Sequence, residues 1–218
     1  MISLSQTWMD GLLVMLMLTN LILLGASRLG HGIRLIAIQG ALLGALPILG
    51  GQHGWTARML FLAVITIGLK AVVFPWFLHR ALRAGEARRE DNPFVGHTAS
   101  VLAGLVMLTV ATCLSARLPT VGAGHSMLVM PVALFMILTG PFLITSRRKA
   151  LSQILGYVVL ENGMYAFGLV MLQDVPALVE LGILLDAFVA LFVMGAAVHQ
   201  INREFDHMDA DQLDSLKG

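Results

Sequence analysis

The stretch that decides the fold runs from Ala150 to Leu172 and reads ALSQILGYVVLENGMYAFGLVML. It is apolar and long enough to cross the hydrocarbon layer of a membrane, which takes about 20 residues of α-helix. Glu161 nevertheless stands at its centre. A charged side chain at the middle of a bilayer costs between about 2.5 and 17 kcal/mol. Glu161 therefore indicates a function inside the membrane, and we expect ion movement.

The composition extends this interpretation to the whole chain. Of the 218 residues, 57% are hydrophobic and 12% are charged, and the mean hydropathy is +0.83. Soluble domains carry about 25% charged residues. The chain is therefore predicted to be an all-α integral membrane protein. The net charge of +1 gives no indication of a nucleic-acid partner, because the basic residues fall in loops.

Seven segments are apolar and close to the length that a membrane helix needs, with ends predicted to about three residues. They are Gly11–Ser27, Ile33–Gly50, Ala57–Leu78, His97–Ser115, Ser126–Thr145, Ala150–Leu172 and Ala177–Gln200. We expect four regions: a three-helix block at 1–80, a basic loop and linking helix at 81–125, a second three-helix block at 126–203, and an acidic tail at 204–218. The basic loop is placed at Arg80–Asn92.

The basic residues predict the orientation. Eleven of the 14 Lys and Arg follow the first, third, fifth and seventh segments, and only Arg58 and Arg117 flank the other side. Basic loops stay in the cytoplasm. We therefore expect a multi-pass protein of the bacterial cytoplasmic (inner) membrane, with the N-terminus outside and the C-terminus in the cytoplasm.

Two acids lie near the midplane of the last two segments. Asp186 falls about nine residues into the seventh segment, a depth close to that of Glu161. The short connection from Gln173 to Pro176 makes the two helices antiparallel neighbours, so both carboxyls can face a common seam. Glu161 and Asp186 are predicted to form a proton relay. The alternative for Glu161 is a protonated carboxyl that hydrogen-bonds a neighbouring helix and only stabilises packing.

Lys70 in the third segment is predicted as a further element of the relay, because a buried lysine can exchange its proton. Pro75 follows it and removes the helix hydrogen bond to the carbonyl of Ala71, which leaves a polar, kinked patch. In the alternative interpretation, the ammonium snorkels past Phe74 toward His79 at the cytoplasmic edge.

Several other polar residues are candidates for accessory roles. Tyr165 shares a helical face with Glu161, and Asn162 is adjacent to it. Gln39 enters through a weak internal repeat, in which Gln39-Gly40 corresponds to Glu161-Asn162 and Lys70 corresponds to Asp186. The remaining accessory candidates are Glu180, His79 and His199.

No residue pattern predicts a cofactor or metal on this chain. Cys113 is the only cysteine, which excludes an internal disulfide and a thiolate-bound cluster. The sequence has no glycine-rich phosphate loop, no CxxCH and no HExxH. No two histidines lie at i, i+4 spacing on a helix. We expect a chain without a catalytic centre of its own.

Short stretches of the C-terminal part resemble the NuoK-type subunit of the respiratory NADH dehydrogenase. They are Leu138-Thr139-Gly140, Arg147-Arg148, Leu160-Glu161-Asn162, Leu185-Asp186-Ala187-Phe188 and Asp211-Gln212-Leu213-Asp214. Glu161 matches the first of two glutamates in that subunit, and Asp186 stands in the place of the second. With further helices ahead of this part, the whole chain resembles the hydrogenase-4 component E family.

The resemblance implies a membrane subunit of a group 4 [NiFe] hydrogenase or formate hydrogenlyase-type complex. Its implied partners are antiporter-like membrane subunits, a quinone-subunit-like membrane anchor and membrane lipid. The nickel-iron centre and the iron-sulfur clusters would lie in other subunits. Two alternatives stay open: a subunit of a multisubunit cation/proton antiporter, and a structural scaffold whose charges only pair with neighbouring subunits.

Overall fold

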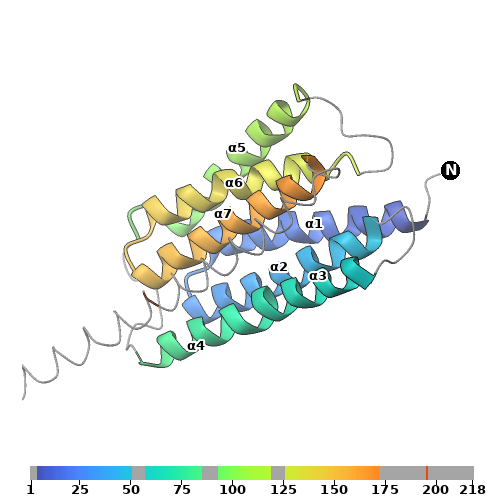
Figure 1. Cartoon of the computed structure of the whole chain (residues 1–218). Helices are drawn as coiled ribbons and strands as arrows, with labels where there is room; N and C mark the ends of the chain where they lie inside the picture. Colours follow the sequence, from blue (N-terminus) through green and yellow to red (C-terminus); the bar gives the residue numbers. More distant parts are fainter. Residues whose placement is uncertain (1–3, 51–56, 85–92, 119–125, 172–194, 196–218) are drawn as a thin grey trace, which may run out of the picture.

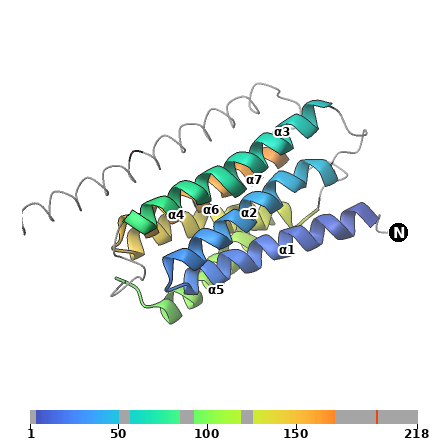
Figure 2. The same ribbon diagram turned by 90° about the horizontal axis from the view of Figure 1, so that it is seen from below.

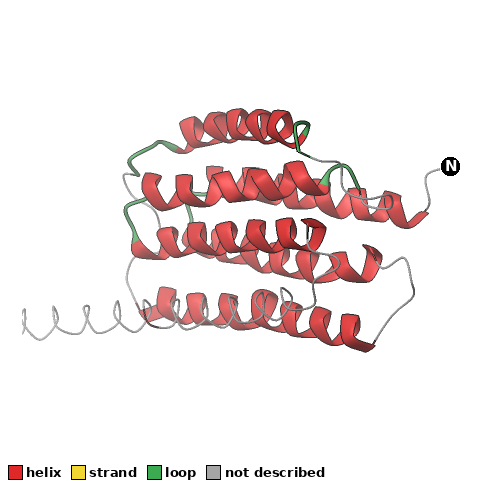
Figure 3. Cartoon of the chain, turned by 45° about the horizontal axis from the view of Figure 1, so that its top comes forward, coloured by secondary structure: helices red, strands yellow, loops and turns green. Residues whose placement is uncertain are grey.

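The computed structural model describes residues 4–50, 57–84, 93–118 and 126–171, together with Gly195. Within these residues every regular element is a helix, and none is a strand (Figure 3). The elements are α1 (Leu4–Gly25), α2 (Leu29–Gly50), α3 (Ala57–Ile67), the π-helix η1 (Gly68–Val73), α4 (Phe74–Ala84), α5 (His97–Ser115), α6 (Val129–Ser146) and α7 (Ala150–Met171). The predicted all-helical class is confirmed.

Five stretches of helix in the described residues are long and apolar enough to cross a membrane. They are Gln6–Gly25, Leu29–Ile48, Ala63–Arg83, His97–Ser115 and Val129–Ser146. Helix α7 has 22 residues, as many as α1 and α2, and contains Glu161 and Asn162. The seventh predicted segment, Ala177–Gln200, lies outside the described residues except for Gly195.

The helices lie side by side and run alternately in opposite directions (Figure 1). Helices α3, η1 and α4 follow one another as a single rod along one edge of the bundle, and α5 lies toward the other (Figures 1 and 2). This alternation brings the ends of α1, α4 and α6 and the starts of α2, α5 and α7 to the same end of the bundle. Most of the basic residues that the structure describes are therefore gathered there.

Glycines on α6 and α7 allow these two helices to pack closely against each other. A Cβ atom on Gly156 would lie 2.9 Å from the carbonyl oxygen of Gly140, and one on Gly163 would lie 2.7 Å from the backbone nitrogen of Ile137. Gly140 in turn lies against the backbone of Leu160. Small residues allow such close approach of helix backbones in a membrane. This packing fixes the position of Glu161, the residue after Leu160.

The predicted starts of the first two helices are wrong. Helix α1 begins at Leu4 and not at Gly11, because Asp10 is accommodated within it: the Ser126 hydroxyl donates a hydrogen bond to Asp10 Oδ1. Helix α2 begins at Leu29 and not at Ile33. The starts of α5 and α7 are as predicted, and α6 agrees within three residues.

The predicted end of the third segment at Leu78 is also wrong, because α4 continues to Ala84. Arg80 and Arg83 lie on its exposed side, whereas Leu78 and Ala81 are buried. The Arg80 guanidinium lies 5.7 Å from the centre of the Trp76 ring. Basic side chains stabilise the C-terminal turn of a helix, so the arginines extend the helix into the predicted loop.

Arg147 differs from the solvated loop residue that the charge pattern predicts. It is only 3% exposed, and its Nη2 donates a 2.6 Å hydrogen bond to the carbonyl oxygen of Leu24. The last carbonyls of a helix have no partner within the helix. Arg147 supplies one to α1 and thereby joins the ends of α1 and α6.

Candidate functional site: a buried ion pair

The helix that carries Lys70 is wound more loosely at this residue than elsewhere. Residues Gly68–Val73 form a π-helix, in which the backbone N–H of Phe74 donates to the carbonyl of Leu69, five residues back. Pro75 follows directly and has no N–H to give. The sequence predicts a kink here, and the structure shows a π-helix between α3 and α4. Segments of this kind occur frequently at functional sites.

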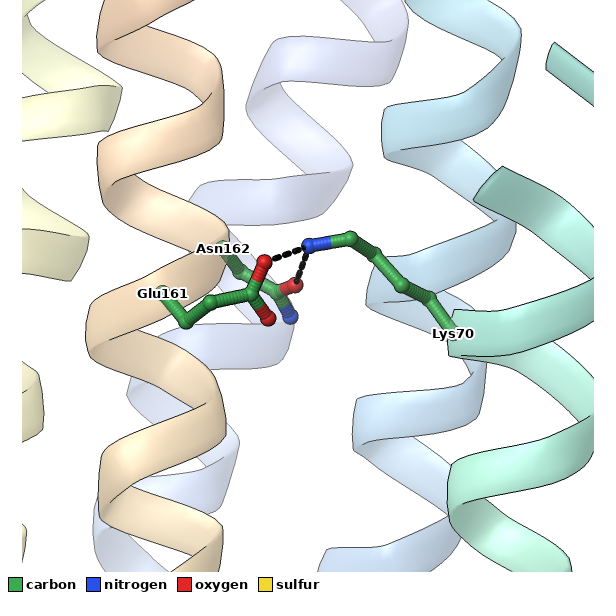
Figure 4. A network of polar contacts seen from close by, with 3 residues as sticks. All are labelled: Lys70, Glu161 and Asn162. Atoms are coloured by element: carbon green, nitrogen blue, oxygen red, sulfur yellow. Dashed lines mark hydrogen bonds and ion pairs between the residues drawn. The ribbon is translucent and has the colours of Figure 1, made fainter. Parts of the chain in front are cut away.

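Lys70 points across the bundle from η1 to α7 (Figure 4). Its side chain is fully buried, and its Nζ forms an ion pair with Glu161 Oε1. The same Nζ donates a 3.1 Å hydrogen bond to Asn162 Oδ1. The Tyr165 ring, one turn further along α7, has its centre 4.9 Å from Nζ. One ammonium therefore contacts three side chains of α7.

Helix α2 packs directly behind Lys70. A Cβ atom on Gly40 would lie 2.6 Å from the Cβ of Lys70 and 2.7 Å from its carbonyl carbon. Four residues on, Gly44 lies against Ile67 in the same way. This Gly-x-x-x-Gly spacing puts both glycines on one face of α2 and lets η1 approach its backbone. The base of the Lys70 side chain is thus held in place.

The two charges of the pair depend on each other. Lys70 is 0% and Glu161 1% exposed. Breaking a buried pair by removing one partner is destabilising by about 3–5 kcal/mol, because the other charge is left unpaired. Transfer of one proton from the ammonium to the carboxylate would neutralise both groups. The pair can therefore hold a proton on either side of the interface between η1 and α7.

A second buried polar contact joins α1 and α6. Asn20 Nδ2 on α1 donates a 2.9 Å hydrogen bond to Thr139 Oγ1 on α6, which itself donates to the carbonyl of Phe135. Thr139 precedes Gly140, which packs on Leu160, so this contact is near the depth of Glu161. Asn20 and its contact with Thr139 were not predicted, although a polar residue in each of two apolar segments is a signal for such a contact.

Four of the predicted residues meet at this site: Lys70, Glu161, Asn162 and Tyr165. The alternative in which Lys70 snorkels to the edge is wrong, because the carboxylate and amide of α7 offer the ammonium partners inside the bundle. His79 lies on α4 instead, with Nδ1 3.2 Å from the carbonyl oxygen of Pro75. The predicted seam between Glu161 and Asp186 involves a residue outside the described ones and stays a prediction, and within the described residues Glu161 pairs with Lys70.

Within the described residues, the remaining predicted side chain, Gln39, makes no hydrogen bond to the pair. Gln39 is fully buried on α2, next to Gly40. Asp186, Glu180 and His199 lie outside the described residues. No group of three or more His, Cys, Asp or Glu side chains that could hold a metal ion comes together within the part of the chain that the structure describes.

Long apolar helices around a wholly buried ion pair define an all-helical membrane protein with a charged interior. The chain is 31% identical over 203 residues to the uncharacterized protein Rv0085 of Mycobacterium tuberculosis, a match that covers 93% of this chain and 92% of that protein. The chain belongs to the same family as Rv0085.

A second similarity covers part of the sequence. Over 89 residues the chain is 38% identical to hydrogenase-4 component E of Escherichia coli K12, and the match spans 41% of each protein. The protein of the same name from Shigella flexneri matches equally. The predicted relation to hydrogenase-4 component E is thus supported over this stretch. No protein-family model and no solved structure matches the chain.

Proposed function

We propose that this protein is a non-catalytic membrane subunit of a hydrogenase-related, complex I-like assembly, and that Lys70 and Glu161 lie on its proton path. The observation that carries the proposal is the ion pair between two fully buried side chains on η1 and α7. The 89-residue similarity to hydrogenase-4 component E supports the class of assembly. Ionisable residues inside membrane segments mark proton relays and ion pathways.

The contacts of Lys70 suggest how the site moves a proton. The ammonium donates to Glu161 and to the amide oxygen of Asn162, so either group can hold it in place. Proton transfer from Lys70 to Glu161 leaves a neutral amine and a neutral acid, which no longer attract each other as ions. The neutral Lys70 amine can then accept a proton from one side of the pair, and the neutral Glu161 acid can release one on the other side. Electron transfer in partner subunits is proposed to drive this exchange by shifting the charge balance.

Asp186 is proposed to provide a second carboxyl of the path, and Tyr165, Glu180, His79 and His199 to be accessory groups. The basic end of the bundle is proposed to face the cytoplasm of a bacterium, with the N-terminus on the outside. The nickel-iron centre and iron-sulfur clusters are expected in partner subunits, and antiporter-like subunits and a quinone-subunit-like anchor are the expected membrane neighbours.

The class of assembly is tested by purification. The full chain with an affinity tag is extracted from its native membrane in mild detergent, and the proteins that accompany it are identified by mass spectrometry. We expect subunits with nickel-iron and iron-sulfur centres. Recovery with cation/proton antiporter subunits alone would contradict the hydrogenase-related assembly and support the antiporter alternative.

The proton path is tested with Glu161→Gln, which preserves the size of the side chain and an oxygen for Lys70 but removes the exchangeable proton. In the purified complex, reconstituted in vesicles, we expect proton uptake to fall by about 10²-fold, the lower range of the contribution of a positioned acid or base. Asp186→Asn is expected to give a smaller loss. Electron transfer is measured alongside in the same vesicles.

Asp10→Asn is the matched control, because it makes the acid-to-amide change at a partly buried carboxylate whose hydrogen-bond partner in the described residues is Ser126. It should leave proton uptake unchanged. An assembled Glu161→Gln complex that pumps at the normal rate would rule out the relay and support a structural scaffold.

A further inference from the structure

Gln39 is a buried amide for which the described residues offer no hydrogen-bond partner. Its side chain is 0% exposed, and neither its Oε1 nor its Nε2 has a partner in the part of the chain that the structure describes. It lies on the buried face of α2 between Ile36 and Leu43, which are also fully buried. Leaving a buried amide unpartnered is unfavourable, so each such group requires an explanation.

The position of Gln39 offers an explanation for its unpartnered amide. Gly40, the next residue, lies against the Cβ and backbone of Lys70. Gln39 is therefore on the wall of α2 at the level of the base of the Lys70 side chain. A lysine has a flexible four-carbon stem and three donors on its ammonium, so the Lys70 side chain has rotamers other than the one that reaches α7.

We propose that Gln39 Oε1 is a second acceptor for the Lys70 ammonium. When Glu161 is charged, the ion pair holds Lys70 on α7. When Glu161 takes up a proton, this attraction ends, and the ammonium turns to the amide oxygen of Gln39 on α2. Gln39 is then a positioning residue that separates the lysine from the protonated acid. Its role in transport rests on the proposed proton path, but the contact itself does not.

The contact is tested by a thermodynamic cycle on the purified full chain in nanodiscs. Glu161→Gln imitates the protonated acid, and Gln39→Met removes the second acceptor at similar volume. In the unchanged protein, we expect Gln39→Met to leave the melting temperature equal or higher, because it removes an unpartnered amide. In the Glu161→Gln background it should lower the melting temperature by about 2–4 °C, the shift for the loss of one hydrogen bond in a protein of this size.

Leu43→Met is the control, since Leu43 is fully buried one turn away on the same face of α2. Its effect should be the same in both backgrounds. If Gln39→Met also has equal effects in both, the second-acceptor role is overturned.

A cryo-EM structure of the Glu161→Gln complex gives an independent result. We expect Lys70 Nζ within hydrogen-bond distance of Gln39 Oε1, and an ammonium that stays on Asn162 would overturn the inference. Neither measurement depends on proton transport. Normal pumping by Glu161→Gln would therefore refute the proton path without deciding the Gln39 contact.

Discussion

Gly40 and Lys70 are in direct contact through their backbones: a Cβ atom on Gly40 would lie 2.8 Å from the carbonyl oxygen of Lys70 and 2.6 Å from its Cβ. A glycine is required at this point because any side chain would push η1 away from α2. With its base held against α2 by this contact, the Lys70 side chain extends to α7 (Figure 4). A residue without a side chain thus positions the buried cation.

We therefore expect Gly40→Ala to destabilise the protein by about 1–3 kcal/mol, the range for overpacking in a well-packed interior. Thermal unfolding of the purified chain in nanodiscs measures the change. The control is Gly11→Ala on α1, where an added Cβ meets nothing within 4 Å. It should be stabilising by about 0.5–1 kcal/mol, because alanine is the better helix former. If Gly40→Ala and Gly11→Ala raised the stability equally, the close contact between Gly40 and Lys70 would not exist.

Lys70→Met should be destabilising by about 3–5 kcal/mol, because it leaves the buried carboxylate of Glu161 without its ion-pair partner. The double change Lys70→Met with Glu161→Leu should recover most of this loss, since a buried pair replaced by apolar residues of similar size is often neutral or better. Denaturant or thermal unfolding of the four proteins gives the coupling energy. Additive effects would contradict the ion pair.

Thr139→Val should be destabilising by about 1–3 kcal/mol. Valine has the shape of threonine but removes the acceptor of Asn20 Nδ2, and the buried amide is then left unpartnered. Thr109→Val is the matched control, because Thr109 is exposed and its hydroxyl contacts only a carbonyl of its own helix. Melting temperatures of the two variants are compared, and equal shifts would argue against the contact between α1 and α6.

Arg147→Met should be destabilising by about 1.5–3 kcal/mol, the range for a hydrogen bond from a charged group, because the carbonyl of Leu24 loses its donor. Arg34→Met, at an exposed position on α2, should stay within about 0.5 kcal/mol. Unfolding in nanodiscs distinguishes the two. If both variants unfold alike, Arg147 acts only as one of the basic surface residues.

The positions of most helices could be predicted because the signals are local. An apolar run of about 20 residues is a membrane-length helix whatever surrounds it, and the predicted segments from His97 and Ala150 begin where α5 and α7 begin. Asp10 and Arg80 misled the prediction, since an isolated charge looks like the end of a span. Each is accommodated instead by one contact, with Ser126 and with the Trp76 ring.

The sequence by itself determined that the chain folds into membrane-length helices and that Lys70 and Glu161 lie inside them, because length and hydropathy are properties of each segment alone. Only the tertiary structure decided that these two charges meet across 91 residues of chain. Their pairing depends on which helices touch, and that follows from backbone contacts at Gly40 and Gly140 and from the π-helix around Lys70. Such contacts arise from shape complementarity between distant segments, which no single segment encodes.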